Sequence, residues 1–141
     1  MADDEKAEIQ AVLDAFNKGL NDKDPAAVTA LYAGDAKIFS LAPPLAEGPD
    51  EAGLALWLSS WDGPVKQELR DFRIEVSGDV AFAYGFIRVC AKTNDGEEAE
   101  WWMRATRCFK KTGDGWKIVN EHDSVPFYMD GSDKAALDLT P

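Results

Sequence analysis

Histidine, cysteine and long apolar runs are scarce in this chain, and each scarcity excludes a class of protein. The 141 residues include one histidine, His122, and two cysteines, Cys90 and Cys108, too few and too scattered for a metal-ligand motif. We therefore expect no metal and no cofactor. No apolar run approaches the ~20 residues of a membrane span. Acidic residues outnumber basic ones, 26 to 15, and the net charge of −11 opposes binding to nucleic acid and to anionic membranes.

The first residues, MADDEKAEIQ, show neither the basic start nor the apolar centre of a signal peptide. We therefore expect a cytoplasmic protein whose two cysteines are reduced thiols rather than a disulfide. The length fits a single domain over residues 1–141. Residues 128–141 are expected to form a loosely held tail.

The first half of the chain predicts three helices. The first is amphipathic and ends near residue 21, with apolar side chains at helical spacing: Ile9, Val12, Leu13, Phe16 and Leu20. In DPAAVTALYA, Asp24 suits the N-cap and Pro25 the first helical position. A short strand (35–40) and a Pro- and Gly-rich loop (41–49) precede the third helix (49–61).

From residue 66 the apolar period changes from helical to alternating. Four segments, 66–78, 80–92, 99–111 and 115–127, are typical of antiparallel strands, and the short turns SGD, TNDGE and TGDG join them. Helices followed by a strand meander indicate an α+β fold with the helices on one face of the sheet.

Three segments resemble the nuclear transport factor 2-like superfamily: DPAAVTALYAGDAKIF, DVAFAYGFIRV and RATRCFKKTGDGWKIVNEHDSVPF. This superfamily includes SnoaL-like polyketide cyclases, ketosteroid isomerases and the kinase II association domain, and the resemblance covers residues 7–127. It implies a cone-shaped fold, in which N-terminal helices and a curved, mostly antiparallel sheet enclose a deep apolar pocket. It also implies a homodimer formed through the opposite, convex face of the sheet. Apolar residues of both parities in the last strand support this, such as Trp116 and Val119.

The segment FNKGLNDKDPAAVTALYAGDAKIFS resembles the start of bacterial ketosteroid isomerases without gaps. Phe16 stands where those enzymes have the oxyanion-binding tyrosine, and Ser40 where they have the proton-transferring carboxylate. The second oxyanion donor would fall near Ala105 or Arg107. Neither Phe16 nor Ser40 can fill those roles, so steroid isomerisation is not expected.

Side chains alternate between the two faces of a strand, and the resemblance indicates which parity faces the pocket. The residues predicted to face it are Phe82, Tyr84, Phe86, Arg88, Trp101, Met103, Ala105, Arg107, Phe109, Val119, Glu121, Asp123 and Val125. The convex, dimer-facing set is Trp116, Ile118, Asn120, His122 and Ser124.

The run EHDS does not form a Ser-His-Asp triad by this pattern, because His122 and Asp123 lie on opposite faces. His122 and Ser124 share a face but lie roughly 6.5–7 Å apart along the strand. Two interpretations of His122 stay open. It is either a hydrogen-bonded residue at the sheet or dimer face, or a pocket acid or base if the parity is inverted.

Asp123 is predicted to face the pocket near Arg107 and Arg88, where a buried carboxylate must be paired. It is either a satisfied ion pair or part of a polar anchor, with arginine offering a planar fork to a carboxylate, enolate or phosphate. The kinase II association domain has pocket arginines at a position resembling Arg107. A carboxylate held by arginine is expected to have a depressed pKa.

The aromatic residues are either core or the walls of a ligand site. Together they favour a flat, apolar small molecule with one polar end. The predicted substrate-binding residues are Tyr32, Trp57, Trp61, Tyr84, Phe86, Arg88, Trp101, Met103 and Arg107, and the catalytic candidates are Asp123 and His122. Two functions stay open: an isomerase, cyclase or hydrolase for an apolar or polyketide-like compound, or a non-catalytic ligand-binding or oligomerisation module resembling the kinase II association domain.

Overall fold

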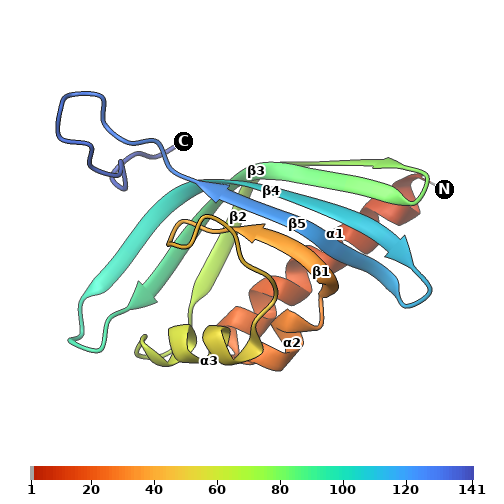
Figure 1. Cartoon of the computed structure of the whole chain (residues 1–141), viewed down its shortest axis with the longest axis horizontal. Coiled ribbons are helices and arrows are strands. Elements are labelled where there is room, and N and C mark those ends of the chain that lie inside the picture. The colour runs from red at the N-terminus through yellow and green to blue at the C-terminus, as the bar shows by residue number, and fades with distance from the viewer. Residues whose placement is uncertain (1) are drawn as a thin grey trace.

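The computed structural model describes residues 2–141, which form helices and strands in the order predicted (Figure 1). The elements are α1 (Ala2–Asn21), α2 (Pro25–Thr29), β1 (Tyr32–Phe39), α3 (Glu51–Ser59), β2 (Lys66–Ser77), β3 (Val80–Lys92), β4 (Glu98–Thr112) and β5 (Gly115–Ser124). No helix within residues 2–141 is long and apolar enough to cross a membrane.

The two short helices begin at aspartate caps, the first of which, Asp24, is predicted from the sequence. The Asp24 carboxylate accepts a hydrogen bond from the backbone N–H of Ala27 at 3.1 Å, and Asp50 accepts one from Gly53 at 3.0 Å. The second helix is shorter than predicted. It ends at Thr29 because the chain extends into β1 from Tyr32 and pairs with β5.

The strands form one curved sheet in the order β1-β5-β4-β3-β2, in which β1 runs parallel to β5 and all other neighbours are antiparallel. The three helices lie together on one side of this sheet (Figure 1). We call the side that they cover the concave face and the other side the convex face. The core lies between helices and concave face, and includes Ile9, Leu13, Phe16, Ile87 and Phe109. The α+β, cone-shaped fold is therefore confirmed.

Two β-bulges change which side chains reach the core. In β2 the register shifts between Arg70 and Arg73, where Asp71 adopts a φ of 55°. Gly85 lies opposite this bulge. A Cβ on it would lie 2.9 Å from the carbonyl oxygens of Arg70 and Asp71, so this position requires glycine.

The second bulge corrects the predicted faces of β5. Cys108 pairs with Asn120 but Phe109 pairs with Ile118, so Val119 is the extra residue. The parity before Val119 is therefore inverted relative to the parity after it. Trp116 and Ile118, predicted on the convex face, are buried in the core instead.

The two faces of β3 are the reverse of those predicted, along the whole strand. Ala81, Ala83, Ile87 and Val89 face the core. The residues predicted there point to the convex face: Phe82, Tyr84, Phe86 and Arg88. Bulky groups such as Phe109 of β4 fill the core beside Ala81, so this end of β3 contributes small side chains.

The C-terminal residues extend beyond the edge of the sheet and fold back on themselves (Figure 1). The backbone N–H of Ala136 donates to the carbonyl of Pro126 at 2.8 Å, and that of Tyr128 donates to Lys134 at 2.8 Å. Ala136 is buried, whereas Met129 is 86% exposed. This segment is thus anchored at one point and otherwise open to solvent.

Candidate functional site

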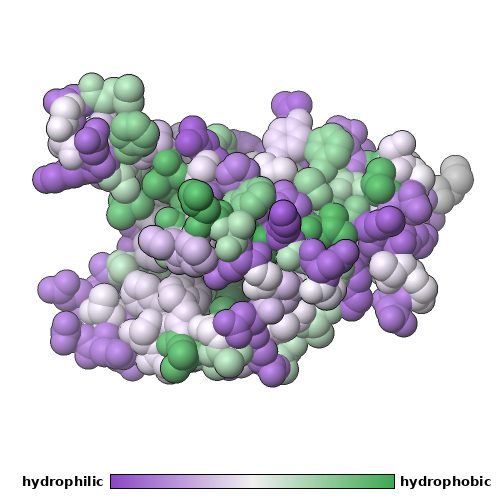
Figure 2. All heavy atoms as spheres, viewed as in Figure 1, coloured by the Kyte–Doolittle hydropathy of each residue, from purple (hydrophilic) through white to green (hydrophobic). Residues whose placement is uncertain are grey.

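A cavity of about 510 Å³ lies between the helices and the concave face. Its volume falls within the range of roughly 300–1,000 Å³ that is typical of small-molecule sites. The loop before α3 forms part of its rim, including Leu41, Pro43 and Glu47. In the space-filling view, apolar residues lie inside a hollow that polar residues surround (Figure 2).

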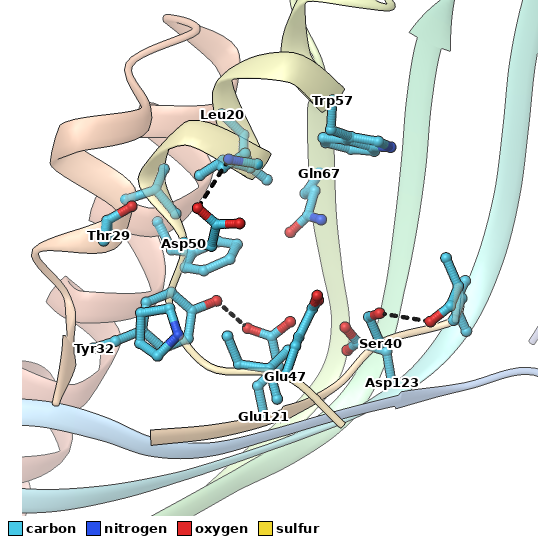
Figure 3. A pocket seen from close by; sticks show the side chains of 18 of the residues that line it. Leu20, Thr29, Tyr32, Ser40, Glu47, Asp50, Trp57, Gln67, Glu121 and Asp123 are labelled. Atoms are coloured by element: carbon cyan, nitrogen blue, oxygen red, sulfur yellow. Dashed lines mark hydrogen bonds between the residues drawn. The ribbon is translucent and has the colours of Figure 1, made fainter. Parts of the chain in front are cut away.

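Four side chains form a polar cluster at one end of this cavity: Tyr32, Arg107, Glu121 and Asp123. Arg107 Nη1 donates to Asp123 Oδ1 at 2.7 Å, and Arg107 Nε lies 3.6 Å from Glu121 Oε1. The Tyr32 hydroxyl donates to Glu121. Figure 3 shows this hydrogen bond and the carboxyl groups of Glu121 and Asp123 at the cavity wall.

The polar cluster is almost completely removed from solvent. The exposed fraction is 3% for the Arg107 side chain and 8% for each of Glu121 and Asp123. Adjacent strands place the three groups, because Arg107 pairs with Glu121 and Ala105 pairs with Asp123 across β4 and β5. One cation therefore faces two carboxyl groups in a site of low polarity.

This arrangement shifts the proton equilibria of the polar cluster. Burial raises the pKa of Asp123 to about 7, and the nearby charge of Glu121 adds to this, while Arg107 opposes it. The expected depression of the Asp123 pKa was therefore wrong, because burial and the second carboxyl group together outweigh the arginine. Burial, and then the charge of Glu121, raises the pKa of Tyr32 well above its usual value, so its hydroxyl stays protonated.

The opposite part of the cavity is apolar and aromatic. Trp57, Trp101 and Met103 line it. Trp61 was predicted to line the cavity but does not. It lies behind the wall, with its ring 6.0 Å from that of Trp57 and 6.2 Å from that of Trp101. Trp61 therefore supports the aromatic wall without forming it.

The structure brings six predicted site residues to the cavity: Tyr32, Trp57, Trp101, Met103, Arg107 and Asp123. Tyr84, Phe86 and Arg88 lie on the convex face, where Arg88 pairs with Glu100 at 2.7 Å. Their predicted contact with a pocket ligand is therefore wrong, for the parity reason given above.

His122 also lies on the convex face, exposed, with its ring 5.3 Å from that of Phe39 and edge-on to it. Thr106 pairs with His122 and Ala105 with Asp123, so the two neighbours face opposite sides of β5. The Ser124 hydroxyl accepts a hydrogen bond from Arg104 at 3.1 Å. EHDS is therefore not a triad, and the inverted-parity interpretation of His122 is wrong.

Sequence reasoning did not select two residues that the cavity exposes to a ligand, Glu121 and Gln67. The alternation that placed Asp123 on the pocket side also placed Glu121 there, so a signal for it existed. Gln67 lies two residues before Leu69, on the same face of β2. Its polarity on this otherwise apolar face was the available signal.

Within residues 2–141, no group of three His, Cys, Asp or Glu side chains is placed to hold a metal ion. The chemistry that the cavity offers is a proton held near neutral pH by Asp123 and hydrogen-bond donors at Arg107 and Tyr32.

Comparison with known proteins agrees with this fold. An NTF2-like protein of unknown function from Pseudomonas putida KT2440 is 28% identical, with a TM-score of 0.88, over 100% of this chain and 99% of that chain. A candidate dehydratase of the NTF2-like family from Streptomyces avermitilis is 19% identical, with a TM-score of 0.78, over 88% of this chain and 97% of that chain. A candidate calcium/calmodulin-dependent protein kinase II association domain from Xanthomonas campestris is 21% identical, with a TM-score of 0.73, over 83% of this chain and 84% of that chain.

The last two similarities are too distant to show more than the fold, and no curated protein matches the chain. The family model of the SnoaL-like domain matches residues 9–128. The chain therefore belongs to the SnoaL-like family.

Proposed function

We propose that this protein binds a small, largely apolar carbonyl compound in the cavity and moves a proton on it, as an isomerase, cyclase or hydrolase requires. The observation that carries the proposal is Asp123. It is a buried carboxyl group at the wall of an apolar cavity, with a pKa of about 7. A general acid or base works best when its pKa lies near the working pH, because both proton states are then populated.

The surroundings of Asp123 support this role. Arg107 holds the carboxyl group in place at 2.7 Å, which limits its orientation toward the cavity. Glu121 is held in turn by Arg107 and Tyr32. Asp123 is thus a carboxyl group with a raised pKa that is fixed in place at the cavity wall.

The test follows proton transfer directly and does not require the natural substrate. The wild-type protein is incubated in D₂O with 4-acetylbiphenyl, and NMR measures the loss of its acetyl protons to deuterium. We expect exchange faster than in buffer, rising through about pH 7 as Asp123 loses its proton. Asp123→Asn should reduce the rate about 10²-fold or more while leaving probe affinity nearly unchanged.

Glu100→Gln is the matched control, because Glu100 is also paired with an arginine but lies on the convex face. It should leave the exchange rate unchanged. If wild-type protein and buffer exchange a panel of aryl ketones equally fast, the catalytic proposal fails. The better account is then a non-catalytic binding module, like the kinase II association domain for which the Xanthomonas campestris protein is named.

We also propose that two copies associate through the convex face. Val80, Phe82 and Tyr84 are exposed there, and the rings of Phe82 and Tyr84 stack 6.0 Å apart. This apolar surface, not Trp116 or Ile118, supports the proposal. Light scattering at micromolar concentration should give the mass of two chains, and Phe82→Glu should shift it toward one.

A further inference from the structure

We propose that Gln67 and Trp101 form a second polar recognition point of the cavity, which binds a hydroxyl group on the far end of the ligand. This inference rests on the proposed function and extends it, because it specifies a ligand with polar groups at both ends.

The sheet places Gln67 and Trp101 in one row across the concave face. Gln67 in β2 pairs with Val89 in β3, and Val89 pairs with Trp101 in β4. All three residues line the cavity. Figure 3 shows the Gln67 amide beside Trp57, facing the cavity across from Glu121 and Asp123.

Both side chains carry a buried polar atom that lacks a partner. Among residues 2–141, the buried side-chain atoms without a hydrogen bond are Trp61 Nε1, Gln67 Oε1 and Trp101 Nε1. Trp61 does not line the cavity, whereas Gln67 and Trp101 do, with these two atoms covered by their surroundings. An unpaired buried polar atom destabilises a folded protein, and this cost is offset where a ligand supplies the partner.

A hydroxyl group offers both the acceptor and the donor that these two atoms lack. The indole Nε1 of Trp101 only donates, so it needs an acceptor, and Gln67 Oε1 needs a donor. A hydroxyl oxygen accepts one hydrogen bond and donates another. It also suits Gln67 if the amide is turned over, since the amide nitrogen then donates to it.

The position of this row sets the length of the ligand. Ala105, the partner of Asp123, lies four residues after Trp101 in β4. At about 3.3 Å per residue, the two polar points are roughly 13 Å apart along the sheet. Ile87 and Met103 form the next row, so the surface between the two points is apolar. The ligand class is therefore an elongated, two- or three-ring hydroxy ketone.

The experiment compares 4-acetyl-4′-hydroxybiphenyl with 4-acetylbiphenyl, which differ only in the far hydroxyl group. Isothermal titration calorimetry should show that wild-type protein binds the hydroxy probe about tenfold more tightly. Gln67→Met and Trp101→Phe keep the shape of each side chain and remove one hydrogen-bonding atom. Each should lower this affinity ratio by about threefold or more, while Trp102→Phe on the convex face should leave it unchanged.

Thermal unfolding adds a readout that separates recognition from a structural role. Gln67→Met removes an unpaired buried oxygen, so the ligand-free variant should melt at the same temperature as wild type or higher. A lower melting temperature together with an unchanged affinity ratio would overturn the inference and make Gln67 a structural residue.

The outcomes also separate this inference from the proposed function. Equal affinity of wild-type protein for the two probes would show that the far hydroxyl group bonds to neither Gln67 nor Trp101, and would overturn the inference alone. Hydroxyl-dependent binding without deuterium exchange would uphold it and overturn the catalytic proposal. Failure of both probes to bind would overturn both.

Discussion

The two faces of the sheet each carry an arginine between two acidic side chains, and the distances are the same. On the concave face, Arg107 lies 2.7 Å from Asp123 and 3.6 Å from Glu121. On the convex face, Arg88 lies 2.7 Å from Glu100 and 3.6 Å from Glu68. The difference is solvent, because the exposed fraction of the arginine side chain is 3% for Arg107 and 35% for Arg88.

Burial reverses the effect of the arginine on its carboxylate. The hydrogen bond from Arg88 lowers the pKa of Glu100, which is the ordinary result for an ion pair in water. For Asp123, burial and the charge of Glu121 outweigh Arg107, and the pKa rises to about 7. One arginine between two carboxyl groups therefore forms an ordinary ion pair on one face and leaves a carboxyl group with a raised pKa on the other.

The largest expected difference between the faces is in stability after loss of the arginine. Arg107→Met leaves two buried carboxyl groups without their cation, and should lower the free energy of unfolding at pH 8 by about 3–5 kcal/mol. Arg88→Met should have a much smaller effect, because water screens its partners. Urea denaturation measures both. Similar losses would show that burial does not separate the two faces, unless a second copy covers Arg88.

The pH dependence of stability should also separate the faces. Asp123 has a pKa raised from 3.8 to about 7, so the folded state holds its proton more tightly than the unfolded state. Stability from this group is complete below about pH 4 and is lost as the pH rises through about 7. This difference between the folded and unfolded pKa of Asp123 corresponds to roughly 4 kcal/mol of stability at most.

Asp123→Asn should remove this decline, and urea denaturation from pH 4 to pH 8 would measure it. Because Arg107 keeps Glu121 as a partner, the variant should not show the full cost of an unpaired arginine. A wild-type stability that rises from pH 4 to pH 7, with the rise lost in the variant, would mean that Asp123 is an ordinary salt-bridged carboxylate.

A smaller effect should follow from Glu121→Gln. This change removes the neighbouring negative charge that helps to raise the pKa of Asp123. The pH profile of deuterium exchange should then move toward lower pH by roughly one pH unit. Glu68→Gln is the corresponding change on the convex face and should not move the profile. An unmoved profile in Glu121→Gln would show that burial alone raises the pKa.

The smallest expected effect is in steroid isomerisation, where we expect none. Phe16 and Ser40 both line the cavity, and neither supplies the donor or the base of ketosteroid isomerases. A steroid enone assay should therefore show turnover at the buffer rate. Rapid turnover would mean that Asp123 also acts on steroids, or that the resemblance of these positions is misaligned.

Much of the fold was predictable from local features of the sequence. The aspartate cap at Asp24 and the alternating strands gave the correct order of elements. The placement of Arg107 and Asp123 at the cavity came from the resemblance to the nuclear transport factor 2-like superfamily, and it held because no bulge separates the two residues in the pairing between β4 and β5. The cap and the alternation depend on a few neighbouring residues, which a sequence shows directly.

The sequence by itself determined the alternation within each strand, but only the tertiary structure decided which set of side chains faces the helices. Alternation is a property of the backbone, whereas the choice of face depends on what the helices must cover. Along β3 the alanines face the core because bulky residues from other elements already fill it. In β5 the single extra residue Val119 inverts the parity, and moves Trp116 and Ile118 inward. The raised pKa of Asp123 also depends on the tertiary structure, because burial and Glu121 cause it together. It arises only once the sheet and helices have closed around Arg107.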